Sequence, residues 1–341
     1  MMGSLNQLFK HHDFELIDAH VHLNSPDGVL SKIAGDSGIQ IVTINTEVPF
    51  FPGINEQKKI ARNASNTHFL VTFSTENWGL SGWQDEAIQQ IEQGLNEGAV
   101  GVKIWKNIGM ELQKEDGSYL MADDPSFDPI YRFLCENRVP LLAHLGEPKN
   151  CWLPVDEMTV TSDRDYFANH PQYHMYLHKE MPSYEDQIKA RNRVLEKFPA
   201  LHFIGAHLAS IEWSVDELAC WLNRYPSAGV DLAERVCHLQ HQAILEPEKV
   251  RDFVETYQDR IIYGSDQIDD AMKSEKVLSE IIQNKWGNEF RFFSDSDIQT
   301  AWNVEKPFRG LGLDETVLKK IFRENALRYY PLMNPRHGMS V

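Results

Sequence analysis

The sequence predicts an α/β protein whose eight parallel strands close into a (β/α)8 barrel, the TIM-barrel architecture. Eight short runs rich in Val, Ile, Leu and Phe recur along the chain, and helix-type segments separate them. Runs with so few charges are typical of parallel strands covered on both faces, and eight strands close this barrel. The predicted strands span residues 15–21, 39–45, 69–74, 100–105, 139–144, 201–206, 229–232 and 261–263.

The segments between these runs carry helical patterns. In residues 84–98, apolar residues recur at helical spacing and Gly98 provides a stop. Ser183 stands three residues before Asp186, which predicts a capped helix start. The predicted helices span residues 84–98, 129–137, 183–198, 215–224, 248–257 and 314–330.

Three connections are too long to be simple turns. They span residues 106–128, 146–182 and 271–312, and they follow the fourth, fifth and eighth strands. All three leave the carboxyl ends of strands, where this barrel carries its active site. We therefore expect a somewhat distorted barrel in which long loops form lids or substrate walls.

Composition narrows the class of protein. With 33 Lys and Arg against 50 Asp and Glu, the net charge is −17, which disfavours nucleic-acid binding. The four cysteines are scattered, which is typical of reduced thiols in a cytoplasmic protein. The amino-terminal stretch has no apolar signal-peptide core, and no apolar run approaches the ~20 residues that span a bilayer. We expect one domain over residues 1–341, with homo-oligomer formation left open.

Residues able to bind metal stand at the carboxyl ends of several predicted strands. His20 and His22 alternate along the first strand, so both imidazoles point to the same side. The other strand-end residues are Lys103, His144, His207 and Asp266. A barrel gathers these ends around one axis, and the combination predicts a metal site.

Each of these residues also has a structural interpretation when taken alone. His144 or His207 could be a core histidine bonded to a carbonyl, and Asp266 could cap the following segment. Lys103 could pair with a carboxylate of the barrel, because a buried lysine requires a partner. Their occurrence together at one end of the barrel favours the metal site.

A substrate wall is expected beside that site. The candidates are aromatic or charged residues of the long connections and strand ends, namely Trp105, Glu147, Trp152, His178 and Arg235. Their types suggest a small polar substrate that is anionic or derived from a sugar.

The chain resembles the amidohydrolase superfamily. Several short sequence motifs are similar to those of its amidohydrolase-related branch, which includes the aminocarboxymuconate-semialdehyde decarboxylase-like proteins. The resemblance covers residues 16–330, and the segments that carry it are IDAHVH, GAVGVKIWKN, VPLLAHLGEP, FIGAHLAS, IIYGSD and IFRENALRYY.

The resemblance implies a role for each strand-end residue. His20 and His22 would hold a metal ion with His144, and Asp266 would bind the ion or accept a proton from its water. His207 would bind a second ion or orient the substrate carbonyl. Lys103 stands where binuclear members carry a carboxylated lysine, whereas the decarboxylase-like branch often lacks a lysine there. We expect a divalent metal, foremost zinc, with one ion favoured and two possible if Lys103 and His207 also bind.

These residues predict a metal-dependent hydrolase. A metal with an open position lowers the pKa of its water to roughly 7, Asp266 can shuttle the proton, and the metal or His207 polarises the carbonyl. Cleavage of an amide, lactone or ester fits this site. A metal-dependent carboxy-lyase is the alternative, although Lys103 favours hydrolysis, and a metal-free ligand-binding barrel is the third hypothesis.

Overall fold

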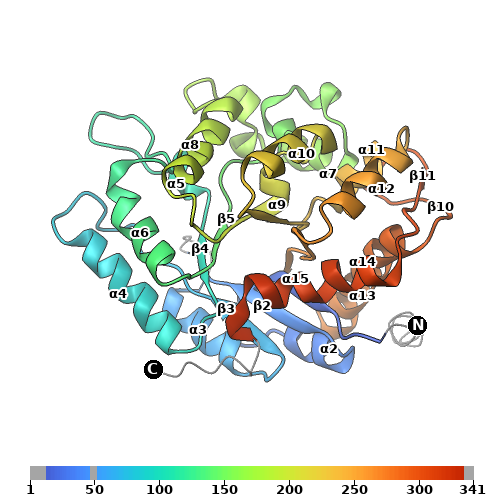
Figure 1. Cartoon of the computed structure of the whole chain (residues 1–341), viewed down its shortest axis with the longest axis horizontal. Coiled ribbons are helices and arrows are strands. Elements are labelled where there is room, and N and C mark those ends of the chain that lie inside the picture. The colour runs from blue at the N-terminus through green and yellow to red at the C-terminus, as the bar shows by residue number, and fades with distance from the viewer. Residues whose placement is uncertain (1–12, 47–51, 334–341) are drawn as a thin grey trace.

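The computed structural model describes residues 13–46 and 52–333 and confirms the (β/α)8 barrel (Figure 1). Each of the eight barrel strands overlaps its predicted run. These strands are β1 Ile17–Leu23, β2 Gln40–Ile44, β3 Thr67–Leu70, β4 Val102–Ile104, β5 Leu141–Ala143, β6 Phe203–Gly205, β7 Gly229–Asp231 and β8 Ile261–Ile262. Strand β9, Gln267–Asp269, follows β8 and pairs in parallel with β1.

Backbone hydrogen bonds close the strands into a ring. The order β3-β2-β1-β9 forms one parallel sheet and β4-β5-β6-β7-β8 forms another. At one seam the amide of Lys103 donates to the carbonyl of Val71 over 2.8 Å, and at the other the amide of Ala19 donates to Tyr263 over 3.0 Å. The carboxyl ends of the strands therefore converge on one face.

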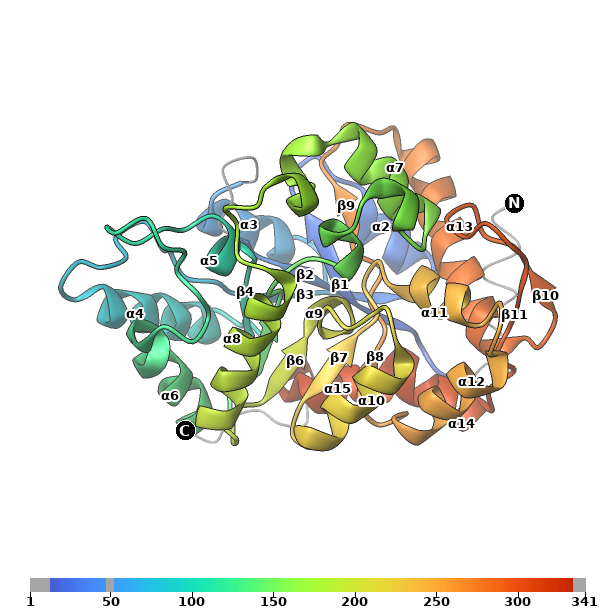
Figure 2. The ribbon, with the colours of Figure 1, turned by 90° about the horizontal axis from the view of Figure 1, so that it is seen from above.

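Helices surround the strands, as Figure 2 shows. They are α2 Leu30–Asp36, α3 Ile54–Arg62, α4 Trp83–Asn96, α5 Asn107–Met110, α6 Asp128–Glu136, α7 Thr161–Asn169, α8 Tyr184–Lys197, α9 Ala206–Ala209, α10 Val215–Arg224, α11 Val236–Gln242, α12 Pro247–Thr256, α13 Glu275–Ser294, α14 Glu315–Lys319 and α15 Asn325–Tyr329. All six predicted helices are present, and a π-helical turn, Lys320–Glu324, divides the last of them. Among the described helices, none has the length and apolar character required to cross a bilayer.

The segment after the eighth strand, residues 271–312, is not the long loop that the sequence predicted. Half of it is the 20-residue helix α13, and it also holds a hairpin of β10 (Ile298–Gln299) and β11 (Phe308–Arg309). The helix forms because Leu278, Ile282, Trp286 and Phe290 recur every fourth residue and are buried on one face. Helix α13 contacts α2 and α14, so it is part of the outer wall of the barrel.

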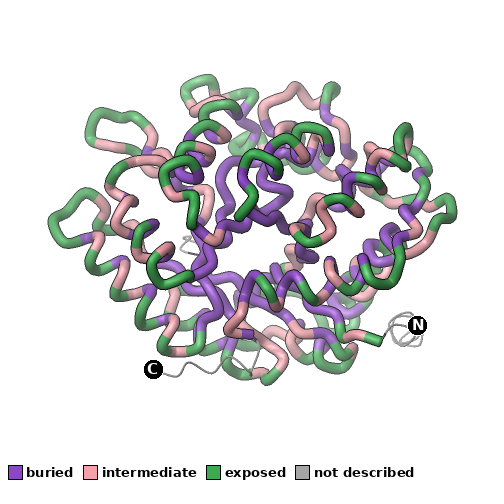
Figure 3. Tube along the Cα trace, viewed as in Figure 1, coloured by how far each residue is buried: buried purple, intermediate pink, exposed green. Residues whose placement is uncertain are grey.

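Two apolar layers hold the barrel together. They lie on the two sides of the central strands, which Figure 3 shows as buried. The outer layer packs strand residues such as Val102 and Phe203 against the helices. The inner layer fills the amino-terminal part of the barrel with residues such as Ile44, Leu70 and Ile262, and Tyr330 packs against them from beneath. The inner apolar layer therefore forms a floor below the active face.

The predicted start of α8 is a complete capping box. Asp186 N donates to Ser183 Oγ over 3.1 Å, and Ser183 N donates to a carboxylate oxygen of Asp186 over 3.2 Å. Because Ser183→Ala removes the acceptor for Asp186 N, we expect it to lower the free energy of unfolding by about 1 kcal/mol. Denaturant unfolding measures the loss, and Ser183→Thr, which keeps a hydroxyl, is the control. An unchanged midpoint for Ser183→Ala would show that this cap does not contribute.

Candidate metal centre

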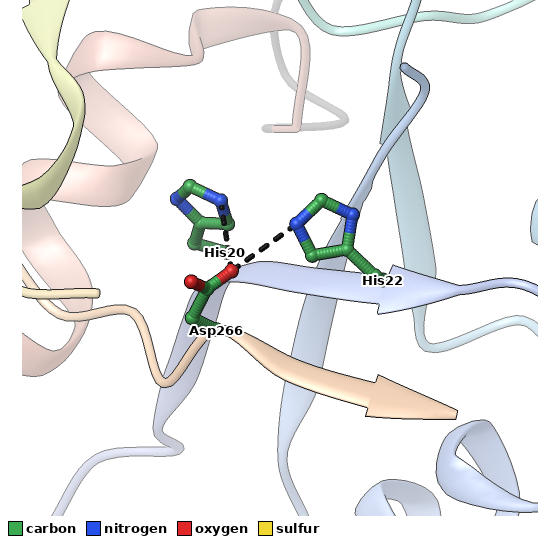
Figure 4. Close-up of side chains that lie close together, drawn as sticks. All are labelled: His20, His22 and Asp266. Carbon is green, nitrogen blue, oxygen red and sulfur yellow. Dashed lines mark ion pairs between the residues drawn. The ribbon is translucent and has the colours of Figure 1, made fainter. Parts of the chain in front are cut away.

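Three side chains meet at the carboxyl ends of β1 and β8. Asp266 Oδ1 lies 3.3 Å from His20 Nε2 and 3.1 Å from His22 Nε2 (Figure 4). One donor atom from each side chain lies within 4.8 Å of the other two. Two imidazoles and a carboxylate at this separation can bind one divalent cation.

The local backbone fixes this arrangement. Asp266 has a φ of 59°, which is unusual for a residue other than glycine, and its amide donates to His20 O over 2.8 Å. Gly264 allows the close approach, since a Cβ at this position would lie 2.7 Å from the Cβ of His20. The turn after β8 is thereby held against β1, with the carboxylate of Asp266 beside both histidines.

His144 and His207 form a second pair beside this group. Their rings lie 4.2 Å apart, with His207 Nε2 at 3.2 Å from His144 Nδ1. His207 Nδ1 lies 2.9 Å from Ala233 O and 3.9 Å from Asp266 Oδ2. If His207 Nδ1 donates to this carbonyl, its Nε2 accepts from His144 and leaves His144 Nε2 unprotonated, as a metal ligand requires.

The segment that carries His207 is strained. Residues 207–210 all have φ between 54° and 59°, although none of them is glycine. Such conformations cost of order 1–3 kcal/mol each and persist only where the surroundings impose them. Here the carbonyls of Ala209 and Ser210 accept hydrogen bonds from Arg191 and Tyr184, which fix the turn.

Asp231 on β7 is a site residue that the sequence analysis did not single out. It is fully buried, and its Oδ2 lies 2.7 Å from His20 Nδ1. Its Oδ1 accepts from the backbone amide of His207 over 2.6 Å. Burial alone would raise the pKa of Asp231, but the neighbouring His20 and His207 outweigh burial and hold this pKa below its usual value. Asp231 therefore directs His20 Nε2 toward Asp266 and fixes the segment of His207.

The charge states also suit a cation. Burial is the largest influence on the histidines, and it lowers the pKa of His22, His144 and His207, so all three imidazoles are neutral. For Asp266, burial acts to raise the pKa, but His20, His22 and His207 hold it well below its usual range. Neutral imidazoles around an ionised carboxylate are the donor set that a divalent metal requires.

A family model described as amidohydrolase matches residues 17–332. The chain belongs to the amidohydrolase family. Among solved structures, a proposed amidohydrolase from Staphylococcus aureus is 13% identical, with a TM-score of 0.54 over 93% of this chain and 100% of its own. An uncharacterised TIM-barrel protein from Bordetella bronchiseptica is 14% identical, with a TM-score of 0.53 over 94% of this chain and 99% of its own.

These two likenesses show the fold. A 2,6-dihydroxybenzoate decarboxylase from Rhizobium is 16% identical over 94% of this chain and 99% of its own, but its TM-score of 0.49 is too low to inform the reaction. The search of curated proteins finds no match. The resemblance inferred from the sequence is thus confirmed at the level of the amidohydrolase family.

Lys103 of this amidohydrolase lies beside the metal-binding group. The side chain is fully buried, and its Nζ has no hydrogen-bond partner among residues 13–46 and 52–333. Burial lowers the pKa of Lys103 to about 8, although Asp231 and Asp266 act in the opposite direction. The charge of Lys103 in turn contributes to the low pKa of His22 and His144, which places it beside the centre.

Of the predicted wall residues, Glu147 lies beside this amidohydrolase centre, and Trp105 and Arg235 are linked to it less directly. Glu147 is buried, with Oε2 3.7 Å from His144 Nε2, and it also pairs with Lys106. The Lys106 ammonium lies 5.4 Å from the ring centre of Trp105. The charge of Arg235 acts on the pKa of both His144 and His207.

The other two wall residues are held within the 146–182 connection. Trp152 Nε1 donates to Pro182 O over 3.3 Å, and His178 Nε2 lies 2.9 Å from Pro171 O. Trp152 also packs edge-on against Tyr184. Their hydrogen bonds to the loop backbone do not bring them to the amidohydrolase centre, and their part in substrate binding stays a prediction.

Proposed function

We propose that this amidohydrolase is a metal-dependent hydrolase that cleaves an amide, lactone or ester bond in a small polar substrate. The observation that carries the proposal is the convergence of His20, His22 and Asp266, whose donor atoms lie within 4.8 Å of one another. A divalent ion, foremost zinc, would supply Lewis acidity and a water of lowered pKa at this position.

The residues around the ion would transfer the proton and complete the ligand set. Asp266 Oδ1 faces the two histidines of β1, whereas Oδ2 lies on the side of His207. Oδ2 can therefore accept the proton of the attacking water and return it to the leaving group. The ion would polarise the substrate carbonyl. His207 would hold His144 in the tautomer whose Nε2 lone pair completes the ligand set.

Removal of the metal tests this proposal. Dialysis against a chelator is expected to lower the hydrolysis rate of a responsive lactone, ester or amide by at least about 10²-fold, because water at its ordinary pKa is a poor nucleophile. Titration with Zn²⁺ should restore the rate, as a pH-stat measures from the acid released. Mg²⁺, which prefers oxygen ligands, is the control ion.

The products distinguish the alternatives. Consumption of substrate with release of CO2 and without a hydrolysed product would replace the hydrolase with a metal-dependent carboxy-lyase. Turnover that survives complete chelation would contradict both metal-dependent reactions, and ligand binding without turnover would favour the metal-free barrel.

A further inference from the structure

Polar side chains form an arc directly above the apolar floor of the barrel. Side chains alternate along a strand, so Thr46 and Thr72 face inward like Ile44 and Leu70, which belong to the floor. Asn24 stands two residues after His22, so by the same alternation both side chains point into the barrel. Lys103 also faces inward, since both its neighbours on β4 belong to the outer apolar layer. The polar arc consists of Asn24, Thr46, Thr72 and Lys103.

The strand register places these four residues side by side. The observed partners are Val21 with Thr43, Ile44 with Leu70, and Val71 with Val102. Continuing each register toward the active face sets Asn24 beside Thr46, Thr46 beside Thr72, and Thr72 beside Lys103. A hydrogen bond of 2.8 Å from Thr72 Oγ1 to Lys103 O supports the last of these pairs.

Three of the four side chains in the polar arc are buried without a hydrogen-bond partner among the described residues. Asn24, Thr46 and Lys103 are at most 8% exposed. Within the described part of the chain, the Asn24 amide, Thr46 Oγ1 and Lys103 Nζ have no hydrogen-bond partner. Because a buried polar group without a partner costs about 1–3 kcal/mol, three such groups together indicate that a ligand supplies the missing bonds.

The two carboxylates whose charges act on Lys103, Asp231 and Asp266, are engaged elsewhere. Asp231 bonds to His20 and to the backbone of His207. Asp266 faces His20 and His22, where its charge would be shared with a bound cation. The Lys103 ammonium therefore lies beside a metal centre without an anion of its own.

A carboxylate matches what the polar arc lacks. Its two oxygens can accept several hydrogen bonds, and Lys103 Nζ, Asn24 Nδ2 and the Thr46 hydroxyl can donate them. Its charge would also pair with a buried ammonium. We infer that the polar arc binds a carboxylate group of the substrate and that the substrate is therefore an anionic acid. The inference rests on the proposed function only in taking this ligand to be the substrate.

Metal content provides the first test, and it does not depend on turnover. Zinc-loaded wild-type protein and Lys103→Met, which keeps the length of the side chain and removes its charge, are compared by elemental mass spectrometry. Equal metal content is expected, because Lys103 binds the ligand and not the ion. Loss of half the metal in Lys103→Met would identify Lys103 as a metal ligand and would overturn the inference.

Binding of matched ligand pairs provides the second test. The probes are benzoate, nicotinate and glutarate, each beside its neutral amide, titrated calorimetrically into zinc-loaded protein. At least one acid should bind wild type more tightly than its amide. The preference is the ratio of the dissociation constant of the amide to that of the acid. Lys103→Met should reduce this ratio at least tenfold, equal to about 1.4 kcal/mol. Asn24→Leu should weaken acid binding in the same direction, and it serves as the second variant if Lys103→Met does not fold.

Asn45→Ala is the control variant. Asn45 is a buried residue next to Thr46, but strand alternation directs its side chain away from the polar arc. This variant should therefore retain the preference for acids. Acids that bind Lys103→Met as tightly as wild type are bound by the metal alone, which overturns the inference, as does a panel in which no acid is preferred. Release of CO2 by the enzyme would change the proposed reaction and leave this binding result intact.

Discussion

Replacement of Asp266 by asparagine is expected to lower kcat by about 10²- to 10⁴-fold, the range associated with a positioned proton acceptor. The amide keeps the shape of the side chain and the backbone bond from Asp266 N to His20 O. It cannot accept the proton of the attacking water, and it places no negative charge between His20 and His22. The measurement is the steady-state rate on the substrate that the chelation experiment identifies.

Metal content separates the two roles of Asp266. If Asp266→Asn retains its metal and loses turnover, Asp266 acts chiefly as the proton acceptor; if the metal is also lost, Asp266 is an indispensable ligand. Asp270→Asn is the matched control, since Asp270 is exposed and its carboxylate accepts a local bond from Met272 N. A rate for Asp266→Asn within tenfold of wild type would contradict its assignment to the reaction.

The residues of the centre were predictable because their chemistry contrasts with their surroundings. His144 and His207 each follow a run of small or apolar residues at a strand end, where an imidazole has no packing role, and Asp266 stands three residues after the apolar run 261–263. Strand alternation and barrel closure then determine that these side chains converge. The structure brings together the four histidines and the aspartate that the sequence indicated, at separations that the sequence alone does not define.

Other features leave a weaker signal. Asp231 lies within a short strand beside Val230 and Leu232, and its importance emerges only when the barrel closes and brings it to His20, 211 positions away in the sequence. The left-handed segment that begins at His207 contains no glycine, so nothing local predicts it. Helix α13 does carry a regular apolar period, but it lies in an excursion whose length suggested a loop.

The buried contact between Asp231 and His20 leads to a second large effect. In Asp231→Asn, the amide oxygen can still accept from the backbone of His207, but the amide nitrogen then faces His20 Nδ1. A donor at that position favours the imidazole tautomer whose proton is on Nε2, the nitrogen that faces Asp266. Because a protonated nitrogen cannot bind a metal, we expect the metal affinity to fall by about 10- to 100-fold.

Competition with a chromophoric chelator measures this affinity, and Asp259→Asn, an exposed residue paired with Lys320, is the control. The comparison with Asp231→Ala tests the mechanism, because alanine also removes the acceptor for the amide of His207. Alanine should therefore reduce the free energy of unfolding as well as the metal affinity, whereas asparagine should act chiefly on the metal. Unchanged affinity in both variants would mean that His20 is oriented by its strand alone and that Asp231 only packs the barrel. A loss in Asp231→Asn without unfolding would instead show that this buried carboxylate sets the tautomer on which the metal centre depends.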